Sequence, residues 1–285
     1  MSVFDYLSPF VLGLIDPGVL LFFAVQAYIQ VLTDTVFTHH SIPNLQAIRG
    51  KAFGKFWEKI SAPPDPSAPL AGSAALVPPL LAQASGVVLD VGPGSGTIIR
   101  HFDSAEKSIS KVYGAEPCVE LHPLLRKNAG LTALGRDAKY ETLLADAMGP
   151  SIARELKRVG VVGSVDDAVE VFDTIVCVRV LCSVPDLDAT IADLWKLLKP
   201  GGKLLVCEHI VNPWRKSEGS MIARVVQSLY MLIGWSYFVG DCSLTRDIEG
   251  ALRAGEKRWK SVELGRYFGR AVFCYVTGVL VKRGP

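Results

Sequence analysis

The sequence predicts an α/β fold built on a doubly wound, mostly parallel sheet, with an antiparallel C-terminal hairpin and an N-terminal apolar helical segment. Three observations predict it. From residue 86 onward, short apolar runs alternate with helix-like segments. The last part of the chain, residues 257–283, reads as two strands with no helix between them. Residues 6–33 contain a single charged residue, Asp16.

The apolar segment, residues 1–40, is predicted to associate with a membrane. Residues 18–32 supply about four helical turns, which is fewer than the roughly 20 apolar residues of a spanning helix. Because Pro17 cannot continue a helix and restricts Asp16, we expect a break there. The segment is then a bent hairpin in one leaflet, a short spanning helix, or a helix packed on the main domain. A cleaved signal peptide is disfavoured, because the first ten residues contain no Lys or Arg.

Residues 41–80 are predicted to form an amphipathic helix and a Pro- and Ala-rich linker. Between residues 44 and 60, apolar side chains recur at mostly helical spacing among four basic ones (Leu45, Ile48, Phe53, Phe56 and Ile60; Arg49, Lys51, Lys55 and Lys59). A basic amphipathic helix beside an apolar segment fits a membrane surface. The linker follows at residues 61–79.

Residues 81–285 are predicted to form the main domain. Its expected parallel strands are residues 87–91, 111–115, 140–144, 174–178 and 203–207. Because parallel strands need crossover connections, the helix-like segments between them are expected to cover the sheet.

Charge and cysteine usage exclude several classes of partner. The 30 basic residues are balanced by 28 acidic ones, and neither forms long runs, so nucleic acid is not an expected partner. The six cysteines show no CxxC pair and no His at zinc-finger spacing. We therefore expect no metal site, and instead buried packing thiols in a reducing compartment. The oligomeric state is left open.

The stretch VVLDVGPGSG, residues 87–96, ends the first strand in a glycine loop. Gly92, Gly94 and Gly96, with Ser95 among them, let a ligand approach the backbone closely. Asp90 precedes the first glycine by two positions, where it would repel a pyrophosphate but suit a cationic amino group. S-adenosylmethionine carries an ammonium and a nucleoside without phosphate, so it is the expected cofactor.

Acidic residues also follow the next two strands. Glu116 lies twenty residues after Gly96, a spacing at which an acid accepts hydrogen bonds from ribose hydroxyls. Asp146 follows the third strand and is expected to receive the adenine amino group, with the Ala147 backbone nearby. Open α/β sheets bind ligands at this carboxyl edge.

With these motifs, residues 86–283 resemble the class I S-adenosylmethionine-dependent methyltransferases. The segments YGAEP (113–117), LLADA (143–147), FDTIVCV (172–178) and LLKPGGKLLVCEH (197–209) carry the resemblance together with the glycine loop. It implies a Rossmann-like fold, with the glycine loop and the three acids as cofactor contacts. It also implies that Arg179 and Val180 line the mouth through which the methyl group is transferred.

A narrower similarity concerns the acceptor. VLCSV (180–184), CEHI (207–210) with Pro213, and GDCSLTR (240–246) look like the methyltransferase-like seven group, membrane-associated enzymes that methylate alkyl thiols. This similarity implies a small lipophilic thiol acceptor and a membrane-associated protein. The catalytic domain would lie in the cytosol, with the endoplasmic reticulum and lipid droplets as candidate membranes. Two alternatives remain open: O-methylation of a carboxyl or hydroxyl of a secondary metabolite, and a non-catalytic cofactor-binding scaffold.

His209 and Asp241 are the candidate catalytic residues. His209 follows the fifth strand and is the best-placed general base, with Asp241 next. A thiol acceptor needs little help from a base, because it is already partly ionised near neutral pH. Residues 210–245 are the expected lid. Within it, the apolar face of residues 221–240 either lines the acceptor pocket or packs in the core.

Overall fold

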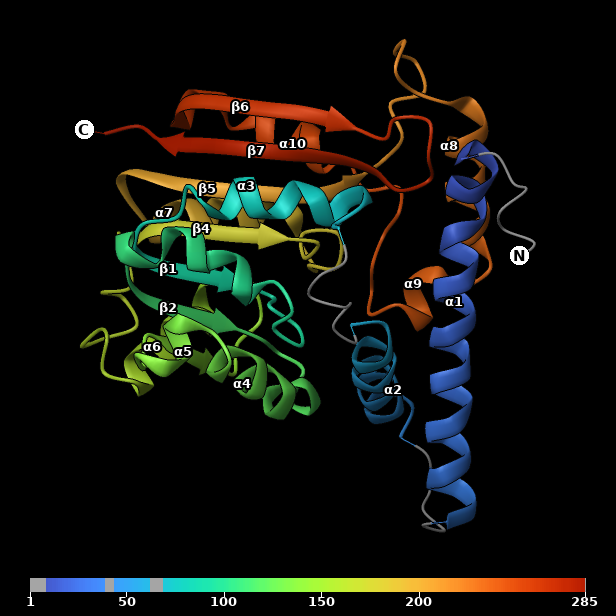
Figure 1. Cartoon of the computed structure of the whole chain (residues 1–285), viewed down its shortest axis with the longest axis horizontal. Helices are drawn as coiled ribbons and strands as arrows, with labels where there is room; N and C mark the ends of the chain where they lie inside the picture. The colour runs from blue at the N-terminus through green and yellow to red at the C-terminus, as the bar shows by residue number, and fades with distance from the viewer. Residues whose placement is uncertain (1–8, 39–43, 62–68, 285) are drawn as a thin grey trace. The chain divides into compact units, whose positions relative to one another are not determined.

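The computed structural model describes residues 9–38, 44–61 and 69–284 (Figure 1). The predicted linker lies partly outside the described residues, at positions 62–68. The chain divides into two compact units. Unit 1 comprises Met1–Ile60, His209–Asp247 and Arg266–Tyr275, and unit 2 comprises Ser61–Glu208, Ile248–Gly265 and Val276–Pro285. The expected lid therefore belongs to unit 1.

Unit 2 is built on a seven-stranded sheet with the order β3-β2-β1-β4-β5-β7-β6. Strands β1 to β5 pair in parallel, and β7 runs opposite to β5 and β6 (Figure 1). The fold class predicted from the sequence is thereby confirmed. The strands are β1 Gly86–Val91, β2 Ile109–Ala115, β3 Tyr140–Leu143, β4 Phe172–Val178, β5 Leu198–Ile210, β6 Trp259–Tyr267 and β7 Cys274–Lys282.

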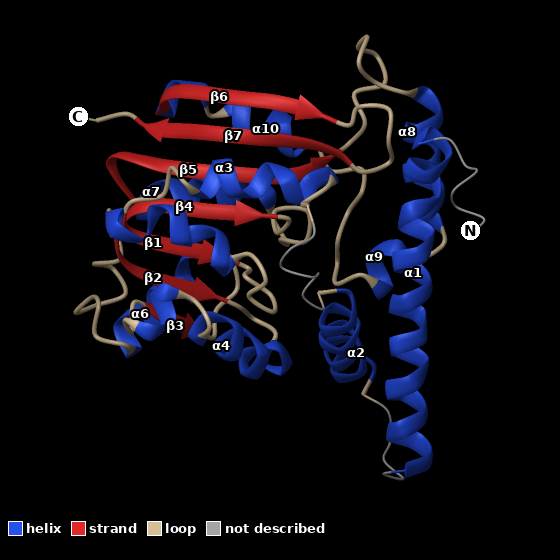
Figure 2. Ribbon diagram, viewed as in Figure 1, coloured by secondary structure: helices blue, strands red, loops and turns tan. Residues whose placement is uncertain are grey.

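Helices cover both faces of this sheet (Figure 2). The helices η3 Gly72–Leu76, α3 Val77–Leu81, η4 Ile99–Ser108, η5 Val119–Leu121, α4 His122–Gly130 and α5 Ala133–Arg136 form one contacting group. In a second group, α7 Leu187–Leu197 contacts both α6 Gly149–Arg158 and α10 Ile248–Ala254. The short η6 Glu256–Arg258 precedes β6. The helix that follows the glycine loop, η4, is a 3₁₀ helix.

The central strands are apolar because both of their faces are covered. Val88 and Leu89 in β1, Ile175 in β4, and Leu204 and Leu205 in β5 are fully buried. Continuous burial of this kind is typical of parallel strands that lie between two helical layers. Because the strands are held between the helices, the carboxyl ends of β1, β2, β3 and β4 are fixed, and the glycine loop and the acidic residues follow these ends.

Unit 1 contains α1 Pro9–Thr33, the π-helix η2 Asp34–Thr38, α2 Leu45–Ile60, α8 Met221–Leu232 and α9 Trp235–Phe238. The amphipathic helix expected at 44–60 is confirmed as α2. Its N-terminus is capped by Asn44, whose side-chain oxygen accepts hydrogen bonds from the backbone N–H groups of Gln46 and Ala47. Ile48 and Phe56 are buried, whereas Leu45, expected on the same apolar face, is exposed.

The predicted break at Asp16–Pro17 is wrong, because α1 is one continuous helix with Pro17 inside it. Proline has no N–H for the carbonyl four residues earlier, which is that of Gly13. In unit 1 the Val272 N–H donates to this Gly13 oxygen at 3.1 Å. The lost helical bond is thus replaced from outside the helix, and the bent-hairpin interpretation no longer holds.

Residues Val11–Phe37 form a helical stretch long and apolar enough to cross a membrane. Its mean hydropathy is 1.7 over the most apolar 18-residue window, of which 22% is buried. The same length and composition also occur in signal sequences, and buried core helices share them. The small buried share argues against a helix packed entirely in a core, since Val19, Phe22 and Ile29 are exposed.

Candidate functional site

The glycine loop follows β1 at the carboxyl edge of the sheet. Gly92, Gly94 and Gly96 all have positive φ, at 62°, 59° and 80°, a region that side chains other than glycine rarely enter. A Cβ at Gly92 would lie 2.6 Å from the Val180 side chain, and one at Gly96 would lie 2.8 Å from that of Leu125. Backbone geometry and close packing together require glycine here.

Asp90 lies beneath this loop with 1% of its surface exposed. The Tyr140 hydroxyl donates to Asp90 Oδ2 at 3.3 Å. Gly114, the β2 partner of Asp90, allows this contact, because a Cβ at Gly114 would lie 2.2 Å from the Tyr140 oxygen. Burial raises the pKa of Asp90 from 3.8 to about 7, while the Tyr140 hydrogen bond lowers the pKa and the nearby Glu116 raises it.

Two buried oxygens at this site lack a hydrogen-bond partner among the described residues: Asp90 Oδ1 and Ser95 Oγ. Buried polar atoms in folded proteins almost always have a partner. The Ser95 backbone itself is fixed, since the Asn128 side chain donates to its carbonyl at 2.7 Å. The two unpartnered oxygens and the close-approach glycines therefore form a cradle suited to a ligand with a cationic donor group.

Glu116 follows β2 and is buried, with 4% of its surface exposed. Its Oε2 accepts from the Gly94 N–H at 2.8 Å, and its Oε1 accepts from the Cys118 N–H at 2.8 Å. Burial raises the pKa of Glu116, and these two hydrogen bonds lower it. The structure thus joins Glu116 directly to the glycine loop, as their common position at the sheet edge predicts.

Asp146 and Ala147 follow β3, with Asp146 exposed and Ala147 buried. The Asp146 carboxylate accepts from the Met148 N–H at 3.0 Å. The Ser151 hydroxyl accepts from the Asp146 N–H at 3.3 Å. These contacts hold the turn before α6, with one face of the Asp146 side chain open to solvent.

Arg179 follows β4 and has φ at 60°, which is unusual for a residue with a side chain. Its N–H donates to the Cys207 carbonyl at 3.0 Å. Glu208 fixes the next two residues, because its Oε1 accepts from the N–H groups of Val180 and Leu181 at 2.9 and 3.1 Å. Glu208 was not among the predicted site residues. The signal that could have found it is an acid inside the apolar run LLVCEHI.

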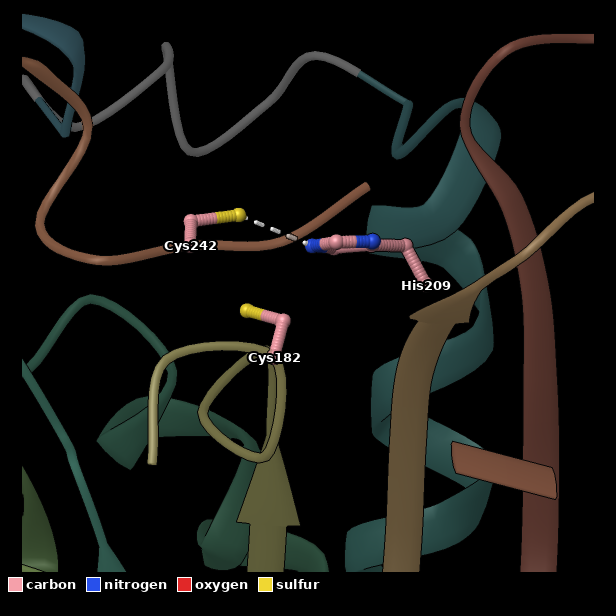
Figure 3. A group of neighbouring side chains, drawn as sticks. All are labelled: Cys182, His209 and Cys242. Carbon is pink, nitrogen blue, oxygen red and sulfur yellow. Dashed lines mark hydrogen bonds between the residues drawn. The ribbon is translucent and has the colours of Figure 1, made fainter. Parts of the chain in front are cut away.

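His209 is buried at the end of β5, with 5% of its surface exposed. Its Nε2 lies 3.2 Å from the Cys242 Sγ (Figure 3). The rings of Phe273 and Tyr275 lie edge-on to the imidazole, with centroids 5.7 and 6.4 Å away. The predicted base is therefore held between two aromatic rings and a thiol.

Asp241, the second catalytic candidate, has a different environment. Its side chain is 68% exposed and forms an ion pair with Arg49 of α2 at 2.6 Å. Arg49 also donates to the Tyr237 carbonyl at 3.1 Å. Asp241 thus holds α2 against the turn after α9 within unit 1, and the described contacts of His209 do not involve it.

The residues expected to line an acceptor pocket lie mostly on α8. The structure leaves them exposed, by between 52% and 82%: Met221, Val225, Leu229, Leu232 and Ile233. Trp235 of α9, by contrast, is buried against Tyr230 and Phe273. The interpretation of the α8 face as core is wrong, and its predicted role as a lid stays a prediction.

The part of the chain that matches known proteins covers most of unit 2. A family model described as a methyltransferase domain matches residues 70–241. A thiol S-methyltransferase, TMT1B of Rattus norvegicus, is 30% identical over 95 residues, which are 33% of this chain and 32% of that protein. The chain therefore matches only about a third of the length of this curated relative.

Solved structures share the fold at low identity. An O-methyltransferase family protein from Burkholderia thailandensis has a TM-score of 0.55, with 15% identity over 95% of this chain and 71% of that chain. PigF with SAH has a TM-score of 0.51 and 14% identity over 92% of this chain and 70% of that chain. Since the family model matches more than half of the chain and solved methyltransferase structures share its fold, this protein belongs to the methyltransferase-domain family and is a class I methyltransferase.

Proposed function

We propose that this protein transfers a methyl group from S-adenosylmethionine to a small lipophilic acceptor, with thiol sulfur favoured over oxygen. The observation that carries the cofactor assignment is the cradle at the end of β1, where the buried Asp90 Oδ1 and Ser95 Oγ have no hydrogen-bond partner in the part of the chain that the structure describes. Asp90 is suited to an ammonium group, and Glu116 and Asp146 to ribose hydroxyls and an adenine amino group. The glycines provide close backbone approach.

The bound cofactor would supply a methyl group on a positively charged sulfur. In such a transfer the acceptor sulfur would bond to the methyl carbon as the carbon–sulfonium bond broke, with that electron pair left on the departing sulfur. A thiol acceptor also releases its proton. The residues of the cradle contribute by holding the reacting atoms in line, and such alignment can supply about 7–11 kcal/mol in favourable cases.

Thiol sulfur is favoured because the curated relative is a thiol S-methyltransferase. The surroundings of His209 agree with this choice, since its Nε2 already has the Cys242 thiol as a partner. A thiol of ordinary pKa, near 8.5, is partly ionised at pH 7 and needs no strong base. A hydroxyl acceptor would require one, and a carboxylate would not.

Membrane association is part of the proposal. It is supported by α1, whose length and composition suffice to cross a bilayer, and by the basic side chains of α2. A lipophilic acceptor would partition into the same membrane. We expect the catalytic domain to lie in the cytosol, on the endoplasmic reticulum or on lipid droplets.

The cofactor assignment is tested by calorimetry on Gly94→Val and Glu116→Ala. Valine is strained at φ 59°, and loss of Glu116 leaves the Gly94 N–H without its acceptor. Both variants should bind S-adenosylmethionine at least tenfold more weakly. Gly130→Val is the matched control, because a Cβ at Gly130 has nothing within 4 Å. Unchanged affinity in both site variants would refute the assignment.

The acceptor is tested by assaying wild type and His209→Gln on matched alkyl thiol, phenol and carboxylic acid substrates. A thiol-specific enzyme should gain rate as pH rises and the thiolate fraction grows, and His209→Gln should cost it little. A hydroxyl-specific enzyme should lose about 10²-fold or more in the variant. Turnover confined to oxygen acceptors would overturn the choice of sulfur. Cofactor binding without turnover on any acceptor would favour the scaffold alternative.

A further inference from the structure

Helix α8 has its apolar and polar sides reversed relative to a helix of a water-soluble domain. Six large apolar side chains are exposed along one side of its twelve residues and the turn that follows: Met221, Ile222, Val225, Leu229, Leu232 and Ile233. Their positions, at 3.6 residues per turn, fall on one half of the helix. A helix in contact with water on this side would normally carry polar residues there. We call these six residues the α8 apolar face.

The opposite side of α8 is held to the rest of unit 1 by polar contacts. The fully buried Gln227 accepts from the Asn212 N–H at 2.9 Å and donates to the carbonyls of Ile210 and Val272 at 3.1 and 2.8 Å. The Tyr230 hydroxyl donates to the Leu14 carbonyl of α1 at 3.2 Å. These bonds fix the rotation of α8, so the apolar face cannot turn inward without leaving buried amide groups unpaired.

We propose that the α8 apolar face binds in the plane of a lipid bilayer that carries anionic headgroups. The segment before α8 has the composition of a membrane interface, because exposed Trp214 is followed by exposed Arg215 and Lys216. The Arg215 guanidinium lies over the Trp214 ring, 4.7 Å from its centroid. Amphipathic rings sit at headgroup level, and basic side chains attract anionic lipids.

The α8 apolar face belongs to a helix that contacts α1, which also exposes apolar side chains. This supports a lipid bilayer, rather than a protein, as the partner of the α8 apolar face. Val19, Phe22 and Ile29 of α1 are exposed in the same unit, and α1 contacts α8 directly. The bilayer would then contact two neighbouring helices of one compact unit, and so a larger apolar surface than α1 alone offers. This inference rests on the membrane association proposed above, but not on the acceptor or on methyl transfer, because it concerns a face of unit 1 alone.

The test places an environment-sensitive fluorophore on Leu232→Cys, the most exposed position of the face at 82%. The full-length chain carries Cys118→Ser, since the other native cysteines are buried. With vesicles of phosphatidylcholine and phosphatidylserine, the emission should shift to the blue, and lipids brominated in their acyl chains should quench it. The same label on Leu131→Cys, 69% exposed in unit 2, is the control and should respond to neither.

Two further measurements separate a lipid from other occupants. Arg215→Gln with Lys216→Gln should weaken the response at Leu232 at least tenfold with anionic vesicles, and leave it nearly unchanged with pure phosphatidylcholine. A label at Leu232 that stays accessible to aqueous iodide on vesicle-bound protein overturns the proposal. So does protection that depends on protein concentration without vesicles, because it would assign the face to a second copy of the chain.

Discussion

At the scale of single residues, the buried carboxyl of Asp90 suits a ligand but lowers the stability of the ligand-free protein where that carboxyl has to ionise. Its carboxyl is buried, and the pKa is raised to about 7 by loss of hydration. The folded protein therefore holds a proton on Asp90 that the unfolded chain has released above about pH 4. The resulting stability is present at low pH and is lost as pH rises through 7. A cationic ligand group would restore the preference for the ionised form.

Asp90→Asn should accordingly stabilise the ligand-free protein at pH 8. Asparagine keeps an oxygen for the Tyr140 hydroxyl and removes the buried charge, so the free energy of unfolding should rise, by at most about 4 kcal/mol. The gain should disappear near pH 4. Denaturant titrations at the two pH values measure it, with the exposed Asp137→Asn as control. A variant that is less stable than wild type at pH 8 would contradict the argument.

Cofactor affinity should increase as pH rises, whereas the stability contributed by protonated Asp90 decreases. Because the ammonium group pairs with ionised Asp90, the dissociation constant of S-adenosylmethionine should rise as pH falls from 8 to 5. In Asp90→Asn the affinity should be weak at every pH. Calorimetry across this range checks the expectation, and a wild-type affinity that does not change with pH would count against Asp90 as the ammonium partner.

Glu208 supports the turn after β4 through two backbone hydrogen bonds. Glu208→Ala should lower the free energy of unfolding by about 2–4 kcal/mol, because it leaves the N–H groups of Val180 and Leu181 without their acceptor. Glu208→Gln keeps an acceptor oxygen and should lose less. Chemical denaturation of the two variants gives the comparison, and equal losses would show that the charge matters rather than the acceptor.

At the scale of elements, α1 lies in close contact with residues 266–275 of the same unit. Gly13 lies against Ala271, where an added Cβ would be 3.1 Å from the Ala271 Cβ. Gly13→Leu should therefore destabilise unit 1 by about 1–3 kcal/mol. Gly50→Leu is the matched control within α2, since a Cβ there has nothing within 4 Å, and it should be neutral or slightly stabilising. Thermal unfolding in detergent compares the two.

The strands and α2 were predictable from the sequence because their local pattern and their packing agree. Val88, Leu89 and Val91 of β1, for example, are apolar and buried, so composition alone identifies this strand. Pro17 and α8 were not predictable in this way. The carbonyl that Pro17 leaves unpaired is satisfied by Val272, more than 250 residues later in the chain, and the outward orientation of α8 depends on the buried contacts of Gln227.

At the scale of the whole molecule, ligand binding should appear as a change in thermal stability. A ligand that binds the folded state adds about 2.7 kcal/mol at one hundred times its dissociation constant. S-adenosylmethionine should therefore raise the melting temperature of the full-length protein clearly more than that of Gly94→Val at the same concentration. Differential scanning calorimetry measures both. An equal rise in the two proteins would place the ligand elsewhere.

The candidate cofactor site was largely predictable, since Asp90, the glycines and Glu116 come from short motifs at strand ends. The structure joins Glu116 to Gly94 and buries Asp90, as expected for one cradle. Asp241 was predicted only as the next candidate base after His209. Its ion pair with Arg49 of α2 could not be foreseen, because nothing local in either segment specifies the other.

The hydrogen bond from the Val272 N–H to the Gly13 carbonyl couples the position of α1 to that of residues 266–275. Helix α1 can therefore slide along its axis only if this bond breaks or if residues 266–275 move with it. The same residues carry Phe273 and Tyr275, whose rings flank His209. A shift of α1 along its axis that carries residues 266–275 with it would therefore also move the two rings that contact the imidazole.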